Sequence, residues 1–334
     1  MAEVACGVAA SGCSTLADDH LVLEDAPDSY DEAITSSCWR QAMQEEYSSL
    51  VENETWELST LTAMCSASKK AIGSKWIFKI KTNPDGSVRH KVRLVIKGYK
   101  QELGVDFGET WAPVAKLTSL RMVLALAAKY GLMLRHMDVT TAFLNPRIDS
   151  LVFMDLPPGT DWLDPAACIG SRESVCRLLK ALYGLKQAPR LWFKDIDTYL
   201  QSIGFKHSSA DPNLFTHTTM QVILLLYVDD ILIASITTEA LETVKRLLHE
   251  KYKMVDLGPA SQFLGLKIRQ TPTAIHLSQA RYTISTILRR FDMTNSSLQW
   301  MCYTDCNGAG SGSTGSHSAW SSRVTVRDQA LLSL

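Results

Sequence analysis

The chain has 334 residues, 46% of them hydrophobic, which is enough to bury the core of one large domain or of two ordinary ones. Its formal net charge of −1 is unevenly distributed. Residues 1–60 hold 13 acidic side chains and one basic one, so residues 61–334 carry a net charge of +11. The cysteines form no C-x-x-C pair, no secretory leader is visible, and the most apolar run, 222–234, is too short to cross a bilayer. From these features we expect a soluble intracellular chain whose cysteines are reduced.

The acidic N-terminal part predicts little regular structure before its first helix. Residues 1–30 are acidic and poorly patterned, so we expect them to be disordered. Residues 31–58 favour an amphipathic helix that carries Ala42, Met43 and Leu50 on its apolar face.

A basic β-hairpin is predicted next. Residues 72–82 and 87–98 have strand character, and the Asn-Pro-Asp-Gly run at 83–86 between them is a strong turn signal. Residues 69–100 hold ten lysines and arginines against one acid. This charge indicates a polyanionic partner, and a simply solvated surface is the alternative.

The remaining elements alternate between helices and strands. A helix at 117–130 closes before Gly131, and a strand follows at 132–139. The further predicted elements are helices at 186–203, 239–252 and 279–291, apolar strands at 222–228 and 231–234, and a strand pair at 263–269 and 274–277. The glycine- and serine-rich composition after residue 298 indicates a disordered or non-homologous tail at 299–334.

Two adjacent carboxylates interrupt the most apolar part of the chain. Asp229 and Asp230 lie between two apolar strands, where a tight turn would place them at its tip. Carboxylates in such a place are costly unless they are paired, hydrogen-bonded or bound to metal. An ordinary polar turn is the alternative, because aspartate is common in turns.

A third carboxylate, Asp138, ends an earlier predicted strand and precedes small polar residues. If this strand end lies beside the hairpin, the three carboxylates can hold two Mg²⁺ ions roughly 3.5–4 Å apart. Taken alone, Asp138 is also consistent with a strand-terminating cap.

Several short motifs occur in a fixed order between residues 31 and 298. They are NETWEL (53–58), IGSKWIFK (72–79), KVRLVIKGY (91–99), GVDF (104–107), APV (112–114), MDV and TAFLN within 137–145, LYGLKQAPR (182–190), YVDD (227–230) and FLGL (263–266). In this order they resemble the reverse transcriptase domain of copia-type long-terminal-repeat retrotransposon polyproteins. The resemblance implies an α+β right-hand polymerase over 31–298, with fingers, a palm built on an antiparallel ferredoxin-like sheet, and a truncated thumb.

The resemblance also implies residue roles. Asp138, Asp229 and Asp230 match the catalytic carboxylates, which bind Mg²⁺ or Mn²⁺. The 263–266 run matches a primer-gripping hairpin, and a plain apolar strand is the alternative.

Four further residues match substrate-binding positions. Phe143 is at the sugar-gate position, where a bulky ring would collide with a ribose 2′-hydroxyl, although it also suits core packing. Gln187 lies in the block that supports the incoming nucleotide and the template base. Arg93, together with Lys91 or Lys97, is expected to contact the triphosphate.

Four tryptophans have no motif-based role. We expect packing in the core or at hinges, rather than base stacking, for Trp56, Trp76, Trp111 and Trp192.

The resemblance predicts a fragment of an RNA-directed DNA polymerase. Its partners would be an RNA or DNA template with a primer, deoxynucleoside triphosphates, and originally the ribonuclease H and integrase parts of one polyprotein. A cytoplasmic virus-like particle would be its location, and no membrane would be involved. Two alternatives stay open: an inactive nucleic-acid-binding remnant, and another metal-dependent phosphotransferase using the same carboxylates.

Overall fold

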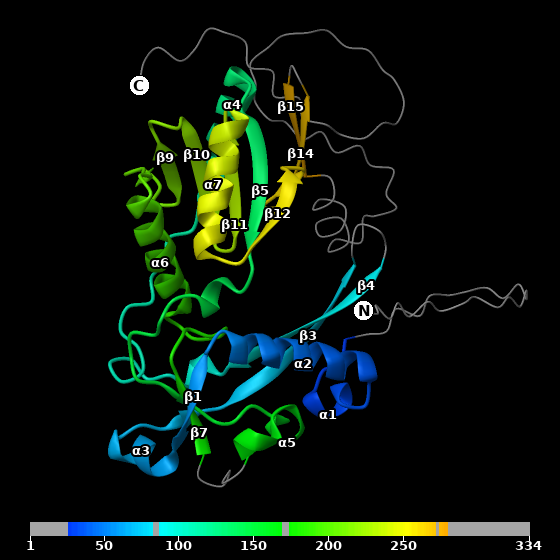
Figure 1. The fold of residues 1–334 in the computed structure, drawn as a ribbon, viewed down its shortest axis with the longest axis vertical. Coiled ribbons are helices and arrows are strands. Elements are labelled where there is room, and N and C mark those ends of the chain that lie inside the picture. Colours follow the sequence, from blue (N-terminus) through cyan, green and yellow to red (C-terminus); the bar gives the residue numbers. More distant parts are fainter. Residues whose placement is uncertain (1–25, 83–86, 169–173, 272–273, 280–334) are drawn as a thin grey trace, which may run out of the picture.

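The computed structural model has a mixed α/β fold in two parts, one around a six-stranded sheet and one around a basic hairpin and the N-terminal helices (Figure 1). It describes residues 26–82, 87–168, 174–271 and 274–279. The predicted turn at 83–86, the tail at 299–334 and nearly all of the helix at 279–291 lie outside these ranges, as does most of the 1–30 segment.

All neighbouring strands of the largest sheet are antiparallel, in the order β12-β5-β11-β10-β9-β8. β5, α6, β10, β11, α7 and β12 occur in this order along the chain, with shorter elements between some of them, and they form a βαββαβ unit. Its four strands lie side by side in the spatial order 4-1-3-2. The strands are β5 (Met133–Val139), β8 (Lys206–His207), β9 (Leu214–His217), β10 (Val222–Tyr227), β11 (Asp230–Ser235) and β12 (Met254–Pro259). The sheet is antiparallel, as predicted.

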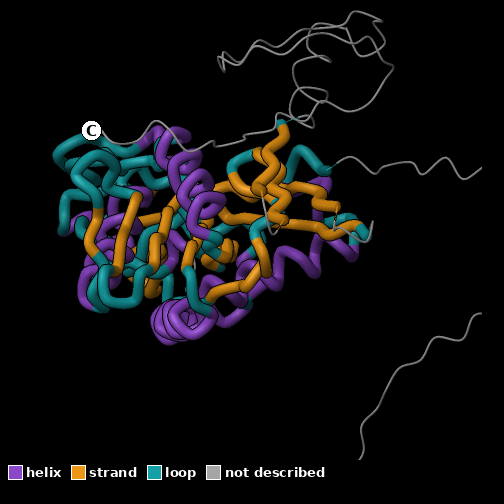
Figure 2. Tube along the Cα trace, turned by 90° about the horizontal axis from the view of Figure 1, so that it is seen from above, coloured by secondary structure: helices purple, strands orange, loops and turns teal. Residues whose placement is uncertain are grey.

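Helices cover both faces of this sheet, and Figure 2 shows them on either side of the row of strands. Alternation along a strand sends successive side chains to opposite faces. Leu224 therefore packs in the core under α6 (Ala188–Ser202) and α7 (Thr238–Lys251), whereas Leu225 packs in the core under α4 (Leu117–Tyr130). Helix α4 has the predicted bounds and ends at Gly131, whose left-handed backbone (φ 66°) terminates a helix without strain.

The second part contains the predicted basic hairpin. Strands β3 (Ser74–Thr82) and β4 (Val88–Ile96) pair along their whole length, and α2 (Ser37–Glu52) packs on them. The buried side of α2 includes Met43 and Leu50, as its sequence pattern predicts.

The predicted helix at 31–58 is wrong in extent. The structure has α1 (Tyr30–Ala33), then α2, and then β1 (Trp56–Thr60). Two side chains add hydrogen bonds to carbonyls near the end of α2. Asn53 Nδ2 donates to Ser49 O at 2.6 Å, and Thr55 Oγ1 donates to Leu50 O at 2.8 Å. Such side-chain to backbone bonds compete with further helical turns.

Two small sheets and several short elements complete the fold. One sheet has the order β1-β7-β6-β2 and the other β13-β14-β15. The remaining elements are β2 (Ala71–Ile72), β6 (Phe153–Met154), β7 (Ser174–Leu178), β13 (Gln262–Phe263), β14 (Leu266–Thr271), β15 (Ala274–Ser278), α3 (Leu61–Ser66), α5 (Thr160–Leu163), η1 (Gly98–Lys100), η2 (Ala142–Leu144) and η3 (Pro165–Cys168). Within the described ranges, no helix has the length and apolarity needed to cross a membrane.

The tryptophans divide into buried and exposed. Trp76 and Trp192 are buried and Trp56 packs at the edge of a core, as predicted. For Trp111 the packing prediction is wrong, because its side chain is 72% exposed. Trp111 lies in an irregular segment, so no strand or helix periodicity turns it toward a core.

Candidate active site

The three aspartates meet at one end of the six-stranded sheet. Asp230 on β11 is directly opposite Asp138 on β5 in the antiparallel register. Val139 N donates to Asp229 O at 2.8 Å, which ties the β10–β11 turn to the end of β5. Residues directly opposite each other in an antiparallel pair have Cα atoms about 4.5–5.5 Å apart. The backbone therefore brings together all three carboxylates that the sequence singled out.

The turn itself is held by a buried side chain. Val228 has a left-handed backbone (φ 56°), which is strained for a β-branched residue. Trp192 Nε1, from α6, donates to Val228 O at 2.6 Å. This bond fixes the turn that presents Asp229 to the open end of the sheet.

The electrostatics of the site favour a bound cation. Burial raises the pKa of Asp138, and the nearby charges of Asp229 and Asp230 raise it further. Burial also raises the pKa of Asp229. Three carboxylates that repel one another in a half-buried place would be relieved by a hard divalent cation, which prefers oxygen ligands.

The side chains are not arranged around a common point. Among the described residues, no group of three or more His, Cys, Asp or Glu side chains is placed to hold a metal ion. Asp230 Oδ1 lies 2.8 Å from His136 Nε2, on the neighbouring strand. The donor chemistry thus fits Mg²⁺ or Mn²⁺, whereas Asp230 is turned toward His136.

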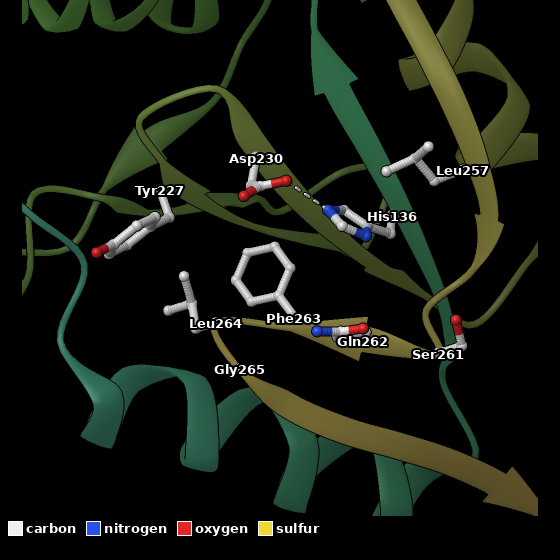
Figure 3. Close-up of a pocket in the computed structure, with 9 residues that line it drawn as sticks. All are labelled: His136, Tyr227, Asp230, Leu257, Ser261, Gln262, Phe263, Leu264 and Gly265. Carbon is white, nitrogen blue, oxygen red and sulfur yellow. Dashed lines mark hydrogen bonds and ion pairs between the residues drawn. The ribbon is translucent and has the colours of Figure 1, made fainter. Parts of the chain in front are cut away.

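A cavity of about 650 Å³ lies beside Asp230 (Figure 3). Its other walls come from His136 on β5, Tyr227 on β10, Leu257 on β12 and the 261–265 segment around the turn that joins β13 to β14. Phe263, which is 1% exposed, packs edge-on against His136 with ring centroids 5.2 Å apart. The 263–266 run is therefore a tight hairpin, with Phe263 paired to Leu266, rather than a plain strand.

The basic hairpin faces the carboxylates. Lys91 and Arg93 lie two residues apart on the half-buried face of β4. Burial lowers the pKa of Lys91, the Arg93 charge lowers it further, and the Asp138 charge opposes this shift. Lys91 and Asp138 therefore lie within electrostatic range of each other.

Tyr183 is a site residue that the sequence analysis missed. The Arg93 guanidinium lies 4.4 Å from the centroid of its ring, and the Phe143 ring packs edge-on against it at 5.3 Å. Burial raises the pKa of Tyr183 to about 12. The available signal in the sequence was the glycine that follows it, Gly184. A Cβ at this position would lie 2.2 Å from Ile96 O, so only glycine allows the 183–184 backbone to lie this close to β4.

Phe143 and Gln187, two of the predicted substrate-binding residues, differ from each other in burial. Phe143, on η2, is half-buried between two cores, so both of its predicted roles stay open. Gln187 is fully buried and bonded inside the protein: its Nε2 donates to Asp106 O and Ser150 Oγ, and its Oε1 accepts from Gln101 Nε2 at 3.0 Å. Gln187 thus stabilises the loop before α6, and any effect on a nucleotide would be indirect.

Comparison with known proteins gives the family. A family described as "Reverse transcriptase (RNA-dependent DNA polymerase)" matches residues 53–304. The chain belongs to this family, in the branch of copia-type retrotransposon polyproteins. It is 40% identical over 261 residues to the Pol polyprotein of transposon TNT 1-94 from Nicotiana tabacum, covering 76% of this chain and 19% of that protein.

Two Arabidopsis thaliana polyproteins are similar to the same extent. The Pol polyprotein of transposon RE2 is 40% identical over 261 residues, covering 77% of this chain and 17% of the relative. The Pol polyprotein of transposon RE1 is 38% identical over 272 residues, covering 80% of this chain and 18% of the relative. The matched part of this reverse transcriptase chain thus spans less than a fifth of each polyprotein.

Proposed function

We propose that this reverse transcriptase domain is an RNA-directed DNA polymerase that transfers a nucleotide from a deoxynucleoside triphosphate to a primer 3′-hydroxyl. Asp138, Asp229 and Asp230 would hold Mg²⁺ or Mn²⁺. The observation that carries the proposal is the register of β5 and β11, which sets Asp138 opposite Asp230 and beside Asp229. Three carboxylates at one open sheet end suit a two-metal site.

The fold suggests a right-hand arrangement. The six-stranded sheet with α4, α6 and α7 would form the palm, and the β3–β4 hairpin with α2 would form the fingers. The β13–β14 turn borders the cavity next to Asp230, where it could hold the primer end. Any thumb would have to follow β15, outside the described residues.

Each group of side chains would have one task. Bound metal would lower the pKa of the primer hydroxyl and stabilise charge on the triphosphate. Arg93 and Lys91 would bind the triphosphate oxygens. Asp230 would have to leave its contact with His136 to share a metal ion with Asp138 and Asp229. Tyr183 and Phe143 would form the surface under the sugar, and the Phe143 ring would exclude a 2′-hydroxyl.

Primer extension on poly(rA)/oligo(dT) with the full chain tests the proposal. We expect Asp229→Asn to abolish extension while template binding stays close to that of the wild type. Asp161→Asn, an exposed change on α5, is the matched control and should extend normally. Template binding without extension by the wild type would refute polymerisation and support the inactive remnant. Extension that needs no template would support another phosphotransferase.

The length of the relatives supports a proposal about partners. Each relative is a Pol polyprotein several times longer than the matched region. We propose that the chain once acted beside ribonuclease H and integrase parts of such a polyprotein, in a cytoplasmic virus-like particle. Detection of the chain in sedimenting particles together with template RNA would test this.

A further inference from the structure

Glu46 on α2 is a half-buried carboxylate with no assigned task. Its Oε1 atom is buried and has no hydrogen-bond partner among the described residues. A buried carboxylate oxygen without a partner costs free energy, so its retention needs a reason.

The surroundings of Glu46 place it at the free edge of β4. One edge of β4 pairs with β3. On the other edge, Ile96 N donates to Tyr183 O at 2.9 Å, and the Leu94 backbone N–H, two residues earlier, stabilises the Glu46 carboxylate. N–H groups two residues apart point to the same side of a strand. Glu46 and Tyr183 therefore occupy successive positions along this edge.

The charges near Glu46 are those of the proposed triphosphate site. Burial raises the pKa of Glu46, while Arg93 and Lys91 act in the opposite direction, so both cations lie within electrostatic range. The described residues show no ion pair between Glu46 and Arg93, whose guanidinium lies over the Tyr183 ring instead. The carboxylate thus balances the two cations without occupying their hydrogen-bond donors.

We propose that Glu46 is the resting counter-charge of Arg93 and Lys91, and that it weakens their hold on a triphosphate. An anion that enters must compete with the field of Glu46, and the same field favours departure of the pyrophosphate product. The identity of the anion as a nucleotide rests on the proposed function. The competition itself concerns only a polyphosphate and the three side chains.

Titration of inorganic tripolyphosphate into the full chain, without metal, tests this directly. Glu46→Gln keeps an oxygen to accept from the Leu94 N–H but removes the charge. We expect its Kd for tripolyphosphate to fall on the order of fivefold, as removal of one nearby negative charge in a partly buried site implies. An unchanged or higher Kd would overturn the proposal and leave Glu46 as a cap of the strand edge.

Three variants make the result specific. Glu45→Gln, an exposed neighbour on the same helix, should bind like the wild type. Glu46→Asp keeps the charge and should also bind like the wild type, so tighter binding by it would contradict the charge argument. In an Arg93→Gln background, Glu46→Gln should lose most of its effect, and a full effect there would rule out Arg93 as the partner.

A parallel primer-extension assay separates this proposal from the proposed function. Glu46→Gln should lower the KM for dTTP by a similar factor. If the wild type does not extend primers, polymerisation fails as the function, whereas the tripolyphosphate titration still decides the role of Glu46. Thermal unfolding of each variant should show one transition near that of the wild type. If Glu46→Gln does not fold, Glu46→Ala, which also removes the charge, decides the question: tighter tripolyphosphate binding supports the proposal, and an unchanged Kd overturns it.

Discussion

The two charged borders of the candidate site are built in different ways. On the acidic border, backbone pairing between β5 and β11 places Asp138 and Asp230, and a turn fixed by Trp192 places Asp229. On the basic border, β4 supplies Arg93, but its position depends on the Tyr183 ring. Strand register together with one side-chain bond places the first border, whereas a ring contact from another segment places the second. The acidic border should therefore tolerate change least.

Loss of a carboxylate should have the largest effect. We expect Asp138→Asn to reduce primer extension on the order of 10³-fold or more, because a cation site with two remaining carboxylates binds and positions its ions poorly. Steady-state extension rates with saturating template measure this. Activity within tenfold of the wild type would show that Asp138 is only a strand cap.

The basic border should respond in binding rather than in rate. We expect Arg93→Ala to raise the KM for dTTP about 10–100-fold, since a charged hydrogen-bond donor to phosphate is lost, with a smaller change in kcat. Lys129→Ala on α4 is a control for loss of one positive charge outside the hairpin. A change in kcat alone would argue that Arg93 does not touch the triphosphate.

Phe143 should affect the choice of sugar. Replacing it with alanine should reduce the preference for dTTP over UTP about 10–100-fold, because the smaller side chain leaves space for a 2′-hydroxyl. Single-nucleotide incorporation with each substrate measures the ratio. If stability falls and the ratio stays constant, Phe143 only packs between the two cores.

Gln187 should matter for stability. Gln187→Ala leaves the Asp106 carbonyl and the Gln101 amide without their buried partner, which we expect to cost about 2–3 kcal/mol in the free energy of unfolding. Urea denaturation measures it. An unchanged midpoint together with a raised KM for dTTP would favour direct contact with the nucleotide.

We expect the smallest effect in the pH dependence of the free energy of unfolding, measured without metal. The folded pKa values of Asp138 and Asp229 are raised, so the folded protein holds these protons more tightly than the unfolded chain does. This stabilisation is complete below the unfolded pKa of about 3.9 and is lost as pH rises through the folded values. Asp138→Asn should flatten this part of the stability curve and raise the free energy of unfolding at neutral pH on the order of 1 kcal/mol. If the free energy of unfolding of Asp138→Asn changes with pH as steeply as that of the wild type, the carboxylates do not repel one another as proposed.

Local patterns in the sequence were sufficient for many elements. The bounds of α4, the two strands of the basic hairpin and the carboxylate turn follow from periodicity and turn residues, which act within a few residues. The predicted extent of the first long helix was wrong, because the helix ends at Glu52, where the Asn53 side chain bonds to the backbone of the last turn. An ordered set of motifs was enough to indicate the family, which the comparisons confirm.

By itself, the sequence determined the secondary structure of the longer elements, the family, and the three aspartates as the group to examine. Only the tertiary structure decided that the Tyr183 ring packs against Arg93, that Gln187 is buried and that Trp111 is exposed. It also showed that Glu46 has a buried carboxylate oxygen without a hydrogen-bond partner among the described residues. The physical reason is that burial and electrostatic partnership depend on segments far apart in the chain. Periodicity states which side of an element is apolar, but not which distant side chain will lie against it.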